Sequence, residues 1–167
     1  MSSDFSLNSV KVASTAIERF EEYLQSRGMR STTPRRILVD YIFKQHRHFD
    51  ADELVEQLPG KNDTGYVSRA TVFRTLNELV EAGLLRKLDL DGRAVFEHDY
   101  GYPQHDHLHC TTCDRLIEFQ SEELKKLREA VASEYKFRVT GHRFIVSGIC
   151  DECARARRRQ RRKVDKV

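Results

Sequence analysis

The segment that decides the fold is SRATVFRTLNELVEA, residues 68–82. Its apolar residues recur every three or four positions, as they do on one face of an α-helix. They are Val72, Leu76, Leu79 and Val80. Ser68 is a favourable N-cap and Gly83 a favourable end, so the sequence predicts a helix over residues 69–82.

Working outward, three more helices are expected before this one. The first covers residues 12–27, the second starts at Thr33-Pro34 and runs to about Lys44, and Asp50 caps a short third helix. Two strands, about 84–88 and 93–97, follow residue 83 and are joined by the turn of residues 89–92. Compact helices followed by a hairpin predict a winged helix-turn-helix.

The second half of the chain alternates strands with one helix. Strands are expected at residues 107–109 and 116–119, and a long strand region at 137–149, interrupted near Gly141. Ser121 caps a helix that is expected to turn Leu124, Leu127, Val131 and Ala132 inward. The whole is an α+β fold whose small carboxy-terminal α/β part needs zinc or dimerisation for stability.

Charge is unevenly distributed along the chain. The net charge is +3, and residues 155–167 carry eight Lys or Arg against the single acid Asp165. That segment sums to +7 and residues 1–154 to −4, so any basic surface on the folded part must be local. The basic segment has two readings, salt-dependent DNA affinity or simple solubility, and the sequence favours neither.

The four cysteines form two CxxC pairs, Cys110/Cys113 and Cys150/Cys153. Thiolates suit a tetrahedral Zn²⁺ site, and two CxxC turns complete it with no open coordination position. Each pair follows a predicted strand, so one ion would join two edges of the sheet. The alternatives are a redox dithiol pair or inert core thiols, but the use of every cysteine in a pair favours structural zinc.

A second group of metal-ligating residues surrounds the HxH motif of His105 and His107. Two residues apart on a strand, both imidazoles point to one face, and Glu118 lies on the neighbouring predicted strand. Imidazole and carboxylate ligands suit Fe²⁺, Mn²⁺, Co²⁺ or Zn²⁺. Spacing favours a metal site over a set of surface histidines, but it does not place His48 or Glu97 in that site.

The helix of residues 69–82 also carries the candidate DNA contacts. Arg69 and Arg74 can reach phosphates or guanine, and Phe73 can contact thymine methyl groups. Further candidates are Ser68, Thr71 and Asn77 on the same helix, Arg30 before the second helix and Arg93 on the wing. The alternative for each is an ordinary solvated surface residue.

Other classes of protein are disfavoured. There is no run of about 18 apolar residues, so no membrane span is expected. Residues 1–10 lack the pattern of a signal peptide, which leads us to expect a cytoplasmic protein. One rival is a zinc-stabilised winged helix that does not sense metal. The main rival class, a mononuclear metalloenzyme, needs a vacant metal position and a general base. We find neither a nucleophile motif nor a glycine-rich phosphate loop, and expect no enzyme and no small-molecule organic substrate.

The order of these motifs resembles the ferric uptake regulator (Fur) family over about residues 15–154. The matching stretches are GMRSTTPR (28–35), ATVFRTL (70–76), HDHLHCTTC (105–113) and IEF (117–119). The resemblance implies a cytoplasmic repressor that binds palindromic double-stranded operator DNA as a homodimer when metal-loaded. It also implies a winged-helix domain (1–98), a hinge (99–104), an α/β dimerisation and metal-binding domain (105–154) and a basic tail (155–167).

Carried over by motif, the family's ligands fall on particular residues. The structural zinc falls on Cys110, Cys113, Cys150 and Cys153. The sensory site between the domains falls on His48, Glu97, His105, His107 and Glu118, so its set is complete. A third family site retains only Asp106 and His142, with Gln104 and Lys125 at or near the other positions. It is expected to be weak or absent, unless Glu122 or Glu123 substitutes.

The ligand types also imply a metal. Zinc-uptake members of the family usually place a cysteine in the sensory site, and all four cysteines here are assigned. Peroxide sensors use Asp where this chain has Glu97 and Glu118. The resemblance therefore implies regulatory Fe²⁺, with Mn²⁺, Co²⁺ or Zn²⁺ able to substitute. The alternative is a manganese-, peroxide- or zinc-responsive member.

Overall fold

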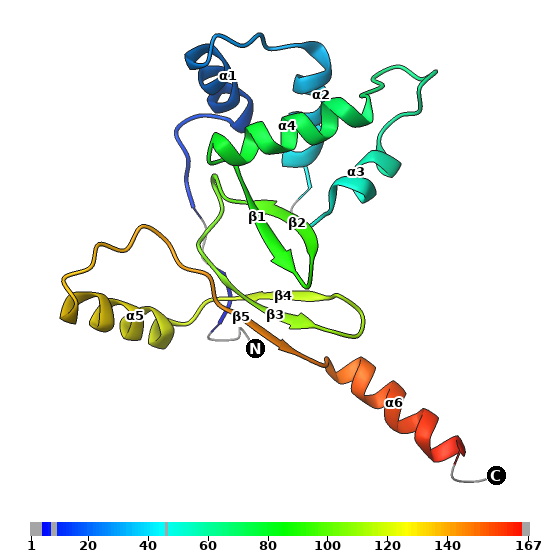
Figure 1. Ribbon diagram of the computed structural model, residues 1–167, viewed down its shortest axis with the longest axis vertical. Helices are drawn as coiled ribbons and strands as arrows, with labels where there is room; N and C mark the ends of the chain where they lie inside the picture. The colour runs from blue at the N-terminus through cyan, green and yellow to red at the C-terminus, as the bar shows by residue number, and fades with distance from the viewer. Residues whose placement is uncertain (1–4, 8–9, 46, 165–167) are drawn as a thin grey trace. The chain divides into compact units, whose positions relative to one another are not determined.

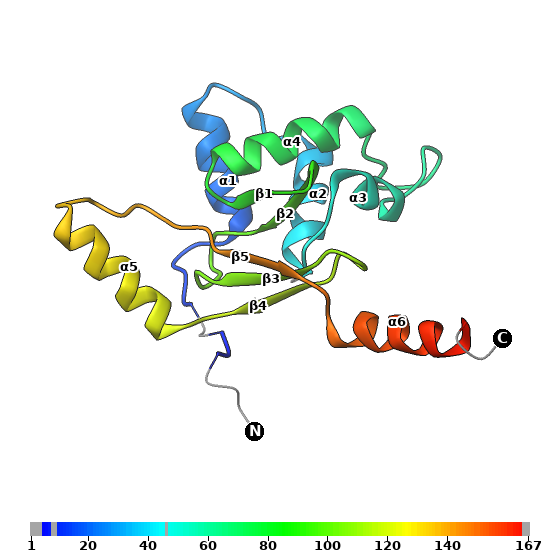
Figure 2. The same ribbon diagram turned by 60° about the horizontal axis from the view of Figure 1, so that its bottom comes forward.

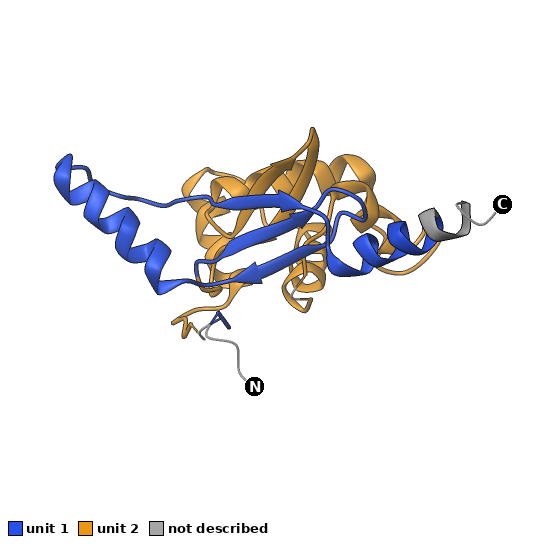
Figure 3. Ribbon diagram, turned by 90° about the horizontal axis from the view of Figure 1, so that it is seen from below, with its two compact units in different colours: residues 1–8, 104–167 blue, residues 9–103 orange. Residues whose placement is uncertain are grey.

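The computed structural model describes residues 5–7, 10–45 and 47–164, and side chains as far as residue 160. Parts of the amino-terminal stretch and of the basic tail, residues 1–4, 8–9 and 165–167, lie outside the described residues. The chain forms two compact units (Figure 3): unit 2 is Ser9–Pro103, and unit 1 is Met1–Asn8 with Gln104–Val167. The expected α+β class is confirmed. Among the described helices, none has the length and apolarity to span a membrane.

Unit 2 begins with four helices (Figure 1), and local signals set where each begins. They are α1 (Ala16–Ser26), α2 (Thr33–Phe43), α3 (Ala51–Gln57) and α4 (Arg69–Glu81). Helix α1 starts four residues later than residue 12, because Thr15 and Glu18 form a capping box there. Asp50 and Ser68 cap α3 and α4 as expected.

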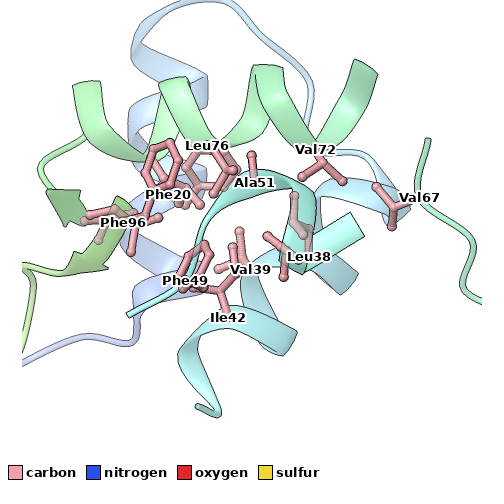
Figure 4. Close-up of a cluster of buried hydrophobic side chains, with 14 of the residues drawn as sticks. Phe20, Leu38, Val39, Ile42, Phe49, Ala51, Val67, Val72, Leu76 and Phe96 are labelled. Atoms are coloured by element: carbon pink, nitrogen blue, oxygen red, sulfur yellow. The ribbon is translucent and has the colours of Figure 1, made fainter. Parts of the chain in front are cut away.

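The core of unit 2 lies between α4 and the other helices (Figure 4). Leu38 and Val39 of α2 and Val72 and Leu76 of α4 have no exposed surface. An ion pair closes the same layer: Arg35 Nη2 of α2 lies 2.5 Å from Glu78 Oε1 of α4, with both side chains at most 13% exposed. The apolar stripe of residues 68–82 is therefore the central packing surface of this unit.

The wing is the antiparallel pair β1 (Leu85–Leu90) and β2 (Arg93–His98). Asp91 and Gly92 join the strands with φ values of 55° and 87°, as a two-residue hairpin loop requires. The strands also extend slightly beyond the expected ranges. One further bridge, Phe49 to Phe96, attaches the segment after α2 to β2.

Unit 1 contains a three-stranded sheet in the order β4-β3-β5. Its strands are β3 (Asp106–Cys110), β4 (Leu116–Phe119) and β5 (Ile145–Gly148). β3 runs antiparallel to β4 and parallel to β5. Helix α5 (Glu122–Glu134) connects β4 to the segment before β5, and α6 (Asp151–Val164) follows β5; the two helices lie at opposite ends of the sheet (Figure 2).

Two expectations for unit 1 are wrong. Residues 137–144 are not a strand, because the β3–β5 register pairs His107 with Ile145 and leaves earlier residues opposite the end of β3. Helix α5 does not turn its apolar face inward, since Leu127 is 62% and Val131 49% exposed. Helix α5 extends away from one end of the sheet and does not lie across its face (Figure 2), so the sheet leaves these side chains uncovered.

We predict that Leu76→Ala lowers the free energy of unfolding by about 2–5 kcal/mol, because it opens a cavity in a fully buried layer. Urea denaturation followed by circular dichroism measures the loss. Asn77→Ala, at the next and exposed position of α4, is the matched control and should change stability by less than about 0.5 kcal/mol. Equal losses for the two variants would contradict this account of the core.

Candidate metal centres

The four cysteines meet because β3 and β5 are parallel neighbours. Cys110 ends β3 and pairs in register with Gly148, the last residue of β5, so Cys150 follows directly beside it. Cys153 lies in the first turn of α6. All four sulfur atoms lie within 4.8 Å of one another. We expected the two cysteine pairs to join the two edges of the sheet. Instead, they join its central strand, β3, to one edge strand, β5.

The electrostatics of this cluster favour a bound cation. The N–H of Cys150 donates to the Cys110 sulfur over 3.3 Å, and this bond lowers the pKa of Cys110 to about 6. Hydrogen bonding to the sulfur atoms of Cys150 and Cys113 raises the pKa of Cys153 to about 12. Four thiolates this close repel one another, so ionising all of them requires a cation among them. Four soft ligands with no open position fit structural Zn²⁺.

A second cluster lies at the start of β3 in unit 1. The imidazoles of His105 and His107 have their centroids 4.7 Å apart, and both residues are buried. His105 Nε2 lies 3.7 Å from Glu118 Oε1, because β4 pairs Glu118 with His107. The structure therefore brings together the two histidines and the carboxylate that the spacing predicted. Their ligand atoms lie within 4.8 Å of one another, a donor set suited to a first-row divalent metal.

Unit 2 contains its own pair of candidate ligands. The antiparallel bridge between Phe49 and Phe96 places their sequence neighbours, His48 and Glu97, side by side. His48 Nε2 lies 3.1 Å from Glu97 Oε2, and Glu97 is buried. Arg86, which the sequence analysis missed, faces Glu97 across the hairpin at 3.6 Å. The hairpin turn was the available signal, since it fixes this register.

The residues left from the third family site form a different arrangement. Asp106 Oδ1 lies 2.9 Å from His142 Nε2, and His142 Nδ1 lies 2.7 Å from Arg128 Nη1. From the sequence, Lys125 was expected near this site and Arg128 was not. The signal was present, since positions three apart share one face of a helix.

Most candidate DNA contacts of unit 2 are exposed. These are Arg30, Arg69, Phe73, Arg74, Asn77 and Arg93, while Ser68 and Thr71 are half-buried. Several of them already make contacts within unit 2. Arg69 lies over the Phe73 ring at 5.0 Å and pairs with Asp52 at 2.5 Å. Arg93 pairs with Asp50 at 2.6 Å, and the Ser68 and Thr71 hydroxyls lie 2.8 Å apart.

Comparison with known proteins gives concordant matches. The model of the "Ferric uptake regulator family" matches residues 26–147. The chain is 31% identical over 137 residues to the ferric uptake regulation protein of Campylobacter upsaliensis, covering 82% of this chain and 88% of that one. It is 30% identical over 134 residues to the peroxide operon regulator of Bacillus subtilis (strain 168), covering 80% and 90%. The crystal structure of the Vibrio cholerae ferric uptake regulator has a TM-score of 0.63 at 31% identity, covering 78% and 98%.

We predict that Cys113→Ser removes the zinc and lowers the free energy of unfolding by more than about 4 kcal/mol, as loss of a structural metal does. The hydroxyl that replaces the thiolate is a poor zinc ligand. Elemental analysis of the purified protein and chemical denaturation measure the two effects. Thr112→Ser, at the neighbouring exposed position, should keep one zinc per chain. Full zinc content in the Cys113→Ser protein would rule out the four-cysteine site.

Proposed function

Because the chain belongs to the ferric uptake regulator family, whose members are metal-responsive regulators that typically bind DNA as dimers, we propose that it represses transcription in the cytoplasm. In this proposal a homodimer binds palindromic operator DNA when its sensory site holds a divalent metal. The observation that carries the proposal is that each unit holds imidazole and carboxylate groups close together, His48 with Glu97 in one and His105 and His107 with Glu118 in the other. Together they match the five ligands that the resemblance implies. The chain is not an enzyme.

The proposed sensory site combines ligands from both units: His48 and Glu97 of unit 2, with His105, His107 and Glu118 of unit 1. Each unit positions its own ligands, unit 2 through the Phe49–Phe96 bridge and unit 1 through the β3–β4 pairing. When bound, a divalent cation there supplies positive charge that the ligands of both units share. Metal binding by both groups of ligands then favours one arrangement of the units about the hinge of residues 99–104. In this proposal that arrangement is the DNA-competent state.

We propose Fe²⁺ as the physiological regulator, with Mn²⁺ as the second choice. Two features of the donor set support this order. No cysteine remains for a zinc-sensing site once four serve the structural cluster. Both carboxylates are glutamates, whereas the resemblance places aspartates in peroxide sensors. Relatives at about 30% identity include iron and peroxide regulators alike, so the ligand types carry this choice.

Helix α4 is proposed as the DNA reader. Exposed Arg74, Asn77 and Phe73 present a cation, an amide and an apolar ring from one helix, the groups that recognise phosphates, base edges and thymine methyl groups. Arg69 and Arg93 would exchange their present carboxylate partners, Asp52 and Asp50, for phosphates. Arg30, Ser68 and Thr71 complete the proposed contact set.

The exposed apolar surface of unit 1 supports the proposed homodimer. None of the residues of α5 is buried, and Leu127, Tyr135 and Phe137 are 62%, 75% and 71% exposed. These side chains belong to a band that continues onto Val131 and Phe144 and lines a cavity of about 590 Å³. A symmetric partner would cover this surface, which would otherwise expose a large apolar patch to water.

We predict that His105→Ala abolishes the metal response while leaving the zinc and the dimer intact. Mn²⁺ should strengthen binding of the zinc-loaded wild type to a duplex selected by that protein by at least about 10-fold, within the usual range of coupling between sites. In His105→Ala the gain should fall to about 1-fold, because one of five shared ligands is lost. Fluorescence anisotropy during Mn²⁺ titration measures it.

His142→Ala is the matched control, since it removes an imidazole from the same unit outside the proposed sensory set. It should keep the Mn²⁺ response. An unchanged response in His105→Ala, with both proteins dimeric and zinc-loaded, would refute the sensory assignment.

A further inference from the structure

We infer that Arg128 replaces a metal ion at Asp106 and His142, so that this chain carries a protein cation at its third family site. The three groups form a row. Arg128 Nη1 lies 2.7 Å from His142 Nδ1, and His142 Nε2 lies 2.9 Å from Asp106 Oδ1. Asp106 is 5% exposed, and Arg128 and His142 are each 25% exposed.

The chemistry of arginine fixes the proton positions in this row. A guanidinium only donates hydrogen bonds and does not lose its proton in proteins. Therefore His142 Nδ1 accepts from Arg128, and the proton of a neutral His142 is on Nε2, which donates to Asp106. Both ring nitrogens are in use, and a cation at one end of the row is balanced by a carboxylate at the other.

This arrangement does not fit a metal ion. A metal would have to displace the Nε2 proton and stand close to the fixed positive charge of Arg128. A second cation, Lys125, lines the same cavity of about 200 Å³. The cavity's acidic groups, Asp106 and Glu122, are matched in number by these two cations. Lys125 Nζ lies 3.7 Å from Glu122 Oε2, and Glu129, outside the cavity lining, lies 3.5 Å from Arg128 Nη2. A dication would leave the site with an excess of positive charge.

The consequence is that α5 is held to residue 142 and to β3 without a regulatory ion. This inference rests on the proposed function, because it makes the sensory site the one that responds to the regulatory metal. The row of Asp106, His142 and Arg128 holds together without a metal. We therefore predict that the third metal site, which the resemblance implies for many family members, is missing here.

Arg128→Glu tests the inference by replacing the cation with a carboxylate beside Asp106 and His142. We expect the zinc-loaded full-length variant, saturated with Co²⁺ and desalted, to retain one more metal ion per chain than the wild type. Arg128→Glu/His142→Ala should lose that extra ion. Arg138→Glu, an exposed arginine of the same unit, makes the same charge change elsewhere and should retain the wild-type number.

Two outcomes overturn the inference. The wild type could lose one Co²⁺ per chain on His142→Ala substitution, which would place a metal there already. Alternatively, folded and zinc-loaded Arg128→Glu could retain no additional ion. Repeating the comparison in the His105→Ala background separates this test from the proposed function, because the difference of one ion should persist when the sensory ligand is removed.

A separate observation, the charge of α6, carries a second inference: we propose that this helix binds the phosphates of double-stranded DNA. Residues 155–163 hold seven Arg or Lys and no acid. The described side chains Arg155, Arg157, Arg158 and Arg159 are all exposed. Like charges three or four positions apart destabilise a helix, and a polyanion relieves that repulsion. A helix of 14 residues is about 21 Å long, enough to follow several phosphates.

The first turn of α6 is held at the four-cysteine cluster. Arg115, in the loop after Cys113, makes a two-armed ion pair with Glu152 at 2.9 and 2.6 Å, and Cys153 belongs to the cluster itself. The cations therefore project from a rigid point of unit 1. Among the described side chains of α6, the apolar ones (Cys153, Ala154 and Ala156) are all small, whereas a helix lying on a membrane needs large apolar side chains. DNA is therefore the favoured polyanion.

The triple substitution of Arg157, Arg158 and Arg159 to Gln tests this surface. It should weaken binding to a random-sequence 30-base-pair duplex and reduce the slope of log K against log[salt] by up to about 2.7, which is about 0.9 for each lost phosphate contact. Lys136, Arg138 and Arg143 changed together to Gln, three exposed cations of the same unit, form the control and should keep the slope.

An unchanged slope in the α6 variant overturns the proposal, provided that the wild type binds the duplex. Binding of the wild type to anionic vesicles, lost in the α6 variant while DNA binding stays the same, also overturns it. Failure of the wild type to bind any duplex would overturn this inference and the proposed function together, whereas an unchanged slope with intact operator binding overturns this inference alone.

Discussion

The backbone pairing of β3 with both β4 and β5 is the constraint on which the chemistry of unit 1 depends. Side chains alternate along a strand, and three ionic centres use this alternation. His105 and His107 face one way, toward Glu118 on β4, while Asp106 faces the other way, toward His142. Cys110 ends the strand beside the residue that leads to Cys150. A shift of one residue in the β3–β4 register would move Glu118 away from the two histidines. A shift in the β3–β5 register would move Cys150 and His142 away from Cys110 and Asp106.

The centres differ in how their charge is balanced. The four thiols of the cysteine cluster would build up too much negative charge to ionise together without a cation, which fits structural Zn²⁺ there. Asp106 has the opposite situation, because the Arg128 guanidinium already balances its charge through the His142 imidazole that bonds to both. Ligand-type residues close together do not by themselves predict a metal site. The neighbouring cations have to be counted as well.

Local signals predicted much of the fold, and contacts between distant residues account for what they missed. Caps at Ser68 and Asp50 fixed helix starts to within a residue, and CxxC spacing gave the cysteine cluster. The nearness of His48 to Glu97 depends on a single bridge between Phe49 and Phe96, which no periodicity shows. Residues 137–144 do not form the expected strand, because a strand needs a partner to pair with. How far that partner extends cannot be read from the sequence of residues 137–144.

The separation of the proposed sensory ligands into two preformed shares has a thermodynamic consequence. His48 and Glu97 alone offer two ligands, and the three ligands at β3 alone leave coordination positions open. In the proposed site, affinity is therefore highest in those conformations in which the two groups of ligands meet. If these are also the conformations that bind DNA, linkage requires DNA to raise metal affinity by the same factor by which metal raises DNA affinity. The metal concentration at which the switch operates would therefore depend on the ligands and also on the fraction of molecules whose hinge conformation brings them together.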